Sequence, residues 1–321
     1  MKPVVRRAAP GEGGGVRRRF VLALGAASGL AATAAMADEL KRAVAGLPAA
    51  DAGNGEAVPL RGRAPSIFVG HGSPMNALQD NRFTHTLRAW GEALGPPRAV
   101  AVVSAHWLTS GSTAVSATRE PETIHDFGGF PPALQTMRYA APGAPSIARQ
   151  AATRLGPRTA AIDASRGLDH GAWTVLHRLY PDADVPVFQV SIDYAQGPAY
   201  HLGVGRALAG LRDEGVLVLG SGNIVHNLGA TEHGAGESDR ASTTWAQDFD
   251  GRVKQALDAG DRAALVAWDA LGTGARMAVA TPDHYYPLLY ALGAARADEA
   301  PRHVFEGFHA GTLSMRCLQW G

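Results

Sequence analysis

The chain has 321 residues, of which 46% are hydrophobic, so it is long and apolar enough to bury a large core. Residues 1–37 hold six basic residues and one acidic residue, which leaves 24 basic and 28 acidic residues, a formal charge of −4, on the remainder. This mildly acidic remainder contains no basic run, which argues against nucleic acid as a partner. The single cysteine, Cys317, excludes an internal disulfide.

An export signal is predicted at the amino terminus. Residues 17–22 read RRRFVL, and an uncharged stretch follows as far as Ala37. Ala35-Met36-Ala37 has the small-x-small pattern of a cleavage site. Residues 1–37 are therefore predicted to be a signal peptide for the twin-arginine export machinery, with a periplasmic location for the mature protein. The alternative is a basic tail or a membrane anchor on a protein that stays cytoplasmic.

Residues 38–64 are predicted to form a short helical stretch and a flexible Gly/Ala-rich tether, followed by a catalytic domain over residues 65–321. In that domain, apolar runs of strand length alternate with amphipathic helical patterns, which predicts one α/β domain. The predicted strands are 66–70, 99–105, 113–118, 160–165, 186–192, 216–222 and one within 311–320. The predicted helices are 144–155, 171–179, 198–212, 243–260, 261–271 and 282–295.

Four histidines lie where a predicted strand ends or a predicted helix begins. Strand ends meet at one rim of a sheet, so imidazoles from several segments can converge there on one metal ion. Glycines close to two of these histidines allow a sharp turn and a close approach of the backbone. Since the chain has twelve histidines, surface or core positions are the alternative reading for each one. The four candidates are His71, His106, His226 and His284.

These histidines lie in the stretches GHGSPMNAL, VVSAHW, GSGNIVHNL and TPDHYYPLLYALG, and TIHDFGGFP and GLDHGAW lie between them. Together the six stretches resemble the class III extradiol ring-cleaving dioxygenases of the LigB-like superfamily, in particular the DOPA 4,5-dioxygenase type. The resemblance covers about residues 65–320. It implies a single α/β domain in which helices flank a central mixed sheet.

The resemblance also implies which residues form the site. The histidines that match the family's metal ligands are His71, His106 and His284, and His226 is either a fourth ligand or an acid/base residue. His125 and His170 are implied to face the substrate or bound oxygen, and His170 is a second candidate for proton transfer.

The expected function is the opening of a catecholic ring with O₂ at one divalent metal ion per chain. A catechol binds through two adjacent oxygens, and a three-ligand site leaves room for O₂ beside it. Fe(II) is expected for activity because zinc has no redox chemistry, although Zn(II) could occupy the same ligands. The alternatives are a zinc-dependent hydrolase and a non-catalytic binding protein on the same fold.

Overall fold

The computed structural model describes residues 62–156, 159–232 and 234–321. The predicted signal peptide, and the predicted tether as far as residue 61, lie outside these residues. Among the described residues, no helix combines the length and the apolar character needed to cross a bilayer.

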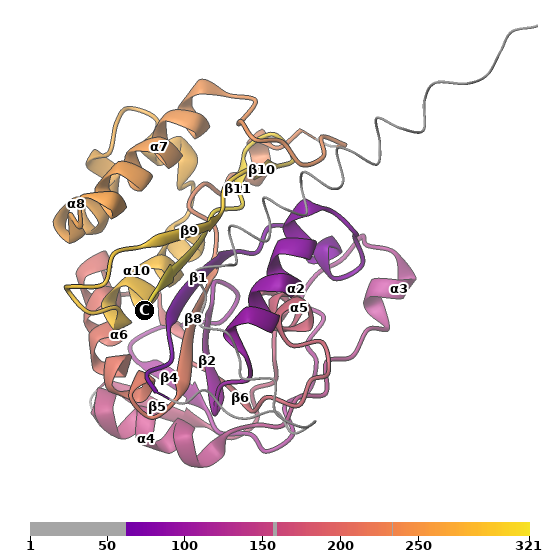
Figure 1. The fold of residues 1–321 in the computed structure, drawn as a ribbon, viewed down its shortest axis with the longest axis vertical. Helices are drawn as coiled ribbons and strands as arrows, with labels where there is room; N and C mark the ends of the chain where they lie inside the picture. The colour runs from indigo at the N-terminus through magenta and orange to yellow at the C-terminus, as the bar shows by residue number, and fades with distance from the viewer. Residues whose placement is uncertain (1–61, 157–158, 233) are drawn as a thin grey trace, which may run out of the picture. The chain divides into compact units, whose positions relative to one another are not determined.

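A six-stranded mixed sheet forms the centre of the described domain (Figure 1). Its strand order is β6-β2-β8-β1-β12-β9. The first four strands in this order run parallel, whereas β12 runs antiparallel to both of its neighbours. This arrangement confirms the predicted fold class. The strands are β1 (Ser66–Gly70), β2 (Ala99–Ser104), β6 (Val187–Gln189), β8 (Val216–Gly222), β9 (Arg302–Phe305) and β12 (Cys317–Trp320).

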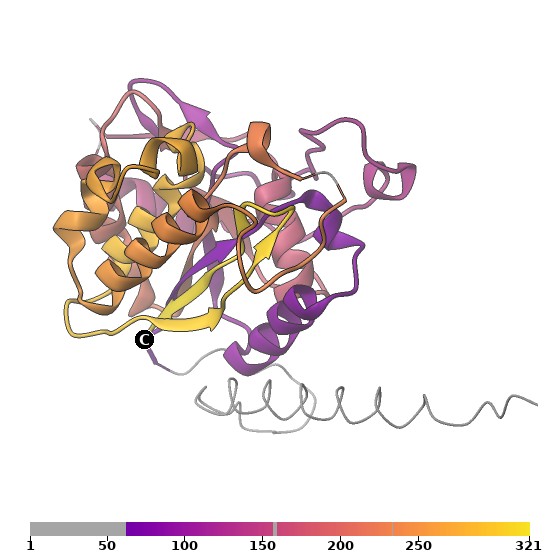
Figure 2. The ribbon, with the colours of Figure 1, turned by 90° about the horizontal axis from the view of Figure 1, so that it is seen from above.

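Both faces of the sheet are buried, which explains why the sequences of its central strands are continuous apolar runs. Successive residues of β2 alternate between two clusters: Ala101 and Val103 pack in one, and Val100 and Val102 in the other. The first cluster includes helices α6 (Pro198–Arg212) and α10 (Tyr286–Ala294). The second includes α2 (Arg82–Leu94) and α5 (His170–Leu179), which lie side by side in Figures 1 and 2.

Several elements depart from the sequence-based expectation. The predicted strand 186–192 divides into β6 and β7 (Ile192–Asp193), and β7 pairs with β3 (Leu108–Thr109) outside the central sheet. The predicted strands near 113 and 160 pair with each other as β4 (Thr113–Ser116) and β5 (Ala160–Asp163). The predicted helix 261–271 is α8 (Arg262–Val266) followed by a 3₁₀ turn, η3 (Trp268–Ala270).

Helix α2 and strand β9 are absent from the sequence-based expectation. The other elements are η1 (Pro74–Ala77), α3 (Pro132–Gln135), α4 (Pro145–Leu155), η2 (Leu228–Ala230), α7 (Thr244–Asp258), α9 (Ala275–Ala278), η4 (Pro282–His284), β10 (Phe308–His309) and β11 (Leu313–Ser314).

The register of the parallel strands determines where the site lies. Gly70 at the end of β1 is opposite Gly222 of β8, and Ser104 at the end of β2 is opposite Ser221. The carboxyl ends of these three strands therefore share one edge of the sheet, the usual position of a ligand site in open α/β sheets.

Candidate metal centre

Three segments deliver the candidate ligands to this edge. His71 directly follows β1, and His106 lies in the turn after β2. His284 ends the 3₁₀ turn η4, and its carbonyl accepts a 2.8 Å hydrogen bond from the backbone N–H of Asn223, next to the end of β8. The Thr281 side chain, which precedes this turn, forms no cap hydrogen bond with it.

The imidazoles of His71, His106 and His284 form a compact group. Each offers a ligand atom, and these atoms all lie within 4.8 Å of one another. The ring centroids are 5.1 Å apart for His71 and His106, 5.3 Å for His71 and His284, and 5.0 Å for His106 and His284. Ligands far apart in the sequence therefore surround one point in space.

Hydrogen bonds fix which nitrogen of His71 carries a proton. The Ser221 hydroxyl donates to the Gly171 carbonyl over 2.6 Å, which uses its only hydrogen. It must therefore accept at 2.9 Å from Nδ1–H of His71. In neutral His71 this leaves a free lone pair on Nε2, the form that binds a metal.

His284 follows the same logic. Its Nδ1 lies 2.5 Å from Oδ2 of Asp283, and an ionised carboxylate can only accept a hydrogen bond. Burial alone would raise the pKa of Asp283, but its hydrogen bonds and the charge interaction with His284 together hold that pKa well below its usual range. The other ring nitrogen, Nε2, is buried without a hydrogen-bond partner.

A cation fits between these nitrogens. Nε2 of His71 and Nε2 of His106 lie 3.2 Å apart. Two ligand nitrogens at about 2.1 Å from one tetrahedral ion would lie roughly 3.4 Å apart. A bound ion would use the lone pair of His71 and satisfy the buried Nε2 of His284, which otherwise costs free energy. The residues present therefore suit a divalent metal held by three imidazoles.

The surroundings keep the rings of His71 and His106 neutral. Burial, and next the neighbouring histidines, lower the pKa of His71 well below its usual value and that of His106 to about 2. Because a protonated imidazole cannot bind a metal, the site favours the form that can.

His226 lies beside the group of three. Its ring stacks on that of His284, with centroids 3.5 Å apart and an interplanar angle of 3°. Lone pairs of parallel stacked rings point along parallel planes and do not converge on one ion. Burial and the adjacent His284 lower the pKa of His226 to about 3. This geometry suits a proton-transfer residue next to the metal better than a fourth ligand.

His170 starts α5 and packs against the metal ligands, with its ring centroid 3.8 Å from that of His106. Its Nδ1 lies 3.0 Å from Oδ1 of Asp126, which is not among the residues predicted from sequence. His125, by contrast, lies 2.9 Å through Nε2 from the Met137 carbonyl, and its ring packs near Trp173. The structure thus brings His170, but not His125, into contact with the candidate ligands.

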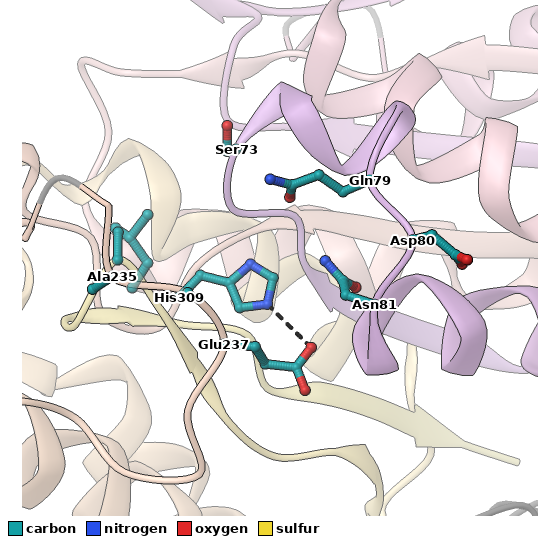
Figure 3. A pocket seen from close by; sticks show the side chains of 10 residues that line it. Ser73, Gln79, Asp80, Asn81, Ala235, Glu237 and His309 are labelled. Atoms are coloured by element: carbon teal, nitrogen blue, oxygen red, sulfur yellow. Dashed lines mark hydrogen bonds and ion pairs between the residues drawn. The ribbon is translucent and has the colours of Figure 1, made fainter. Parts of the chain in front are cut away.

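A pocket of about 350 Å³ lies next to the segment that follows His71, and its wall includes Ser73 (Figure 3). Its other side carries His309, whose Nε2 lies 3.5 Å from Glu237. None of the four candidate histidines lines it. The chemistry of the metal group therefore places the functional site at the strand ends and not in this pocket.

Known proteins match most of the described domain. The family described as the catalytic LigB subunit of aromatic ring-opening dioxygenase matches residues 65–316. A 4,5-DOPA dioxygenase extradiol of Escherichia coli (strain K12) is 44% identical over 264 residues, which cover 81% of this chain and 95% of that protein. A 4,5-DOPA dioxygenase extradiol of Beta vulgaris is 34% identical over 255 residues, which cover 78% of this chain and 93% of that protein.

A solved structure agrees as well. The crystal structure of an uncharacterized protein from Escherichia coli K12 matches with a TM-score of 0.70 and 38% identity, covering 81% of this chain and all of that one. The predicted resemblance, fold class and enzyme class are confirmed by these matches. The chain belongs to the LigB family of aromatic ring-opening dioxygenases, and it is an extradiol dioxygenase, an oxidoreductase that incorporates both atoms of O₂.

Proposed function

We propose that this protein opens the ring of a catechol with O₂ at one Fe(II) ion held by His71, His106 and His284. The observation that carries the proposal is the buried, unpartnered Nε2 of His284 beside the paired Nε2 atoms of His71 and His106. Fe(II), when bound there, would let electron density pass from the aromatic ring to oxygen, which Zn(II) cannot do.

The remaining residues would bind the substrate and move protons. Three neutral imidazoles leave the charge of a divalent ion uncompensated, so the centre favours an anionic ligand such as a catecholate. One histidine would take a hydroxyl proton as the catechol binds, and a histidine would later return a proton to the product. His226 and His170 are the candidates, because both rings lie against metal ligands.

The proposed substrate class is a catechol that carries an amino-acid side chain. Support comes from two relatives that are each named a 4,5-DOPA dioxygenase extradiol, since DOPA is a catechol with an amino-acid side chain. The ring-opened product would be a semialdehyde formed by cleavage beside the diol.

Oxygen uptake by metal-free protein loaded anaerobically with Fe(II) tests this function. We expect uptake with L-DOPA or another member of a panel of catechols, and none with the matched Zn(II)-loaded sample. Hydrolysis of an ester or amide by the Zn(II) form, without oxygen uptake by the Fe(II) form, would replace the proposal with a zinc hydrolase. Partner binding that survives metal removal, in the absence of any turnover, would indicate a binding protein.

We also propose that the protein is exported folded by the twin-arginine route. The support is the RRRFVL motif and the Ala35-Met36-Ala37 site. The ligands His71 and His284 are 213 positions apart in the sequence, so they can share a metal only after folding. A route that carries folded proteins suits such a centre.

A further inference from the structure

Asp126 holds His170 at two points. Its Oδ1 accepts a 2.9 Å hydrogen bond from the backbone N–H of His170 and lies 3.0 Å from Nδ1 of the same residue. The backbone contact anchors the first residue of α5, and the side-chain contact sets the rotation of the ring. One carboxylate oxygen therefore fixes both the position and the orientation of His170.

The same contacts fix the tautomer of the ring. A backbone N–H can only donate, so Oδ1 of Asp126 acts as an acceptor, and an ionised carboxylate offers no hydrogen to Nδ1. Nδ1 of His170 must then carry the hydrogen of the second bond. In the neutral ring this leaves a lone pair on Nε2, which has no hydrogen-bond partner among the described residues.

The free nitrogen belongs to a ring at the metal site. The ring of His170 lies 3.8 Å from that of His106 and 5.9 Å from that of His71, centroid to centroid. Phe127 packs edge-on against the ring of His170 at 5.5 Å, and the His170 side chain is 8% exposed. A ring so enclosed keeps the orientation that Asp126 imposes.

His226 lacks such a partner. Its ring stacks flat on His284, and no residue of the described ranges forms a hydrogen bond with either of its nitrogens. Its tautomer is therefore not set in the way that Asp126 sets that of His170. Of the two histidines that could move protons, only His170 is prepared as an acceptor.

We propose that Asp126 is a positioning residue, which holds His170 as the Nδ1–H tautomer so that Nε2 receives the proton of a substrate hydroxyl at the adjacent centre. This inference rests on the proposed function. In the step, the O–H bond of the catechol breaks, its electron pair stays on oxygen, and the proton binds Nε2. The resulting imidazolium keeps its Nδ1–H bond to Asp126, whose negative charge stabilises it.

The tautomer can be measured without turnover. We would record ¹⁵N-histidine spectra of the Zn(II)-loaded protein and identify His170 by its absence from His170→Gln. The wild type should show hydrogen on Nδ1, and Asp126→Ala should show a mixture or hydrogen on Nε2. An unchanged Nδ1–H tautomer in Asp126→Ala would overturn the inference.

Kinetics provide the second test, using the Fe(II)-loaded enzyme. Asp126→Ala should lower kcat by roughly 100-fold or more, as removal of a general base does, with KM and iron content unchanged. The double variant Asp126→Ala/His170→Ala should be no slower than His170→Ala, because both changes remove one function. Losses that multiply in the double variant would show that Asp126 acts independently of His170.

Two further variants keep the outcomes distinct. Asp126→Asn retains an acceptor oxygen for the backbone of His170, so it should fold even if the alanine variant does not, and it should still lose kcat. Asp182→Asn, an exposed carboxylate, is the matched control and should leave kcat unchanged. If the wild type opens no catechol, the proposed function fails, but the ¹⁵N spectra still decide whether Asp126 sets the tautomer.

Discussion

Hydrogen bonds to neighbouring side chains determine which nitrogen of His71 and of His284 is free. Ser221 fixes the proton of His71, and Asp283 fixes that of His284. Partners of this kind orient metal-binding imidazoles. Their mutation typically weakens metal binding by about 10–100-fold. The role of Ser221 depends on a carbonyl in α5, far away in the sequence, so no local pattern could have identified it.

The first prediction separates ligands from neighbours. His284→Ala should lose bound metal and activity together, because it removes one of three donors. His226→Ala, the matched variant on the stacked ring, should keep near-normal iron and lose turnover by roughly 100- to 10,000-fold. Metal analysis and circular dichroism of both variants provide the measurement. Full metal content in folded His284→Ala would contradict the three-histidine centre.

At the scale of elements, the site depends on how closely the end of β8 approaches the turn that carries His284. A Cβ atom on Gly222 would lie 2.1 Å from the His284 carbonyl oxygen, which is less than any real contact. Only glycine, which has no Cβ atom, allows the end of β8 to meet the turn that carries His284. This agrees with the close backbone approach that the glycines near the predicted strand ends indicate.

The second prediction follows from that contact. Gly222→Ala should destabilise the protein by at least the ~1–3 kcal/mol typical of overpacking, and it should weaken metal binding by displacing His284. Gly251→Ala is the contrasting variant, because Gly251 lies within α7 and its Cβ would meet nothing within 4 Å. It should stabilise the protein by about 0.5–1 kcal/mol. Equal melting temperatures for the two variants would refute this account.

The alternation of strands and helices was predictable from sequence because buried parallel strands are apolar throughout and amphipathic helices repeat every 3.6 residues. Helix α2 shows that pattern in Phe83, Leu87 and Trp90, and its N-cap Asn81 forms a capping box with Thr84, so this helix too is predictable from the sequence. The division of residues 186–192 between two sheets follows from pairing with distant strands, which local sequence does not encode.

The third prediction concerns acid stability at the start of α2. Glu237 accepts hydrogen bonds from Nε of Arg82 at 2.6 Å and from the backbone N–H of Phe83 at 3.0 Å. Burial alone would raise the pKa of Glu237, but hydrogen bonds from His309, Arg82 and Phe83 lower it to about 2. Its stabilising contribution is therefore complete above its usual pKa, near 4.5, and disappears as the pH falls toward 2.

Thermal melts at several pH values test this contribution. Glu237→Gln should melt below the wild type at pH 7, and the difference should shrink as the pH falls from about 5 to 3. Glu92→Gln is the control, because Glu92 is an exposed carboxylate on α2, and it should change the melting temperature little. A difference between Glu237→Gln and the wild type that is constant across this range would count against the assignment.

At the scale of the whole molecule, one sheet edge gathers ligands from segments that span most of the domain. β1 and β2 deliver His71 and His106, and the turn before α10 delivers His284. Because these segments meet only in the folded domain, metal binding should accompany folding. This convergence is predictable from sequence because strand ends share an edge, whereas the contact between Asp126 and His170 depends on how a loop packs against the start of α5.

The fourth prediction concerns export. Replacing Arg17 and Arg18 by lysine should trap full-length protein in the cytoplasm, because the export machinery recognises the arginine pair. Wild-type protein should appear outside the cytoplasm with Asp38 as its first residue, as determined by cell fractionation and amino-terminal sequencing. Wild-type protein that stays cytoplasmic with residues 20–37 attached would identify the segment as a tail or an anchor.

The most direct test of the central claim is ring opening with ¹⁸O₂ by the Fe(II)-loaded protein, with L-DOPA as the first catechol and the products analysed by mass spectrometry. We predict that one O₂ is consumed per ring opened and that both ¹⁸O atoms enter the product, with no reaction by Fe(II)-treated His284→Ala. Incorporation of oxygen from water alone, or equal turnover by the Zn(II)-loaded protein, would contradict an iron-dependent dioxygenase centre at these three histidines.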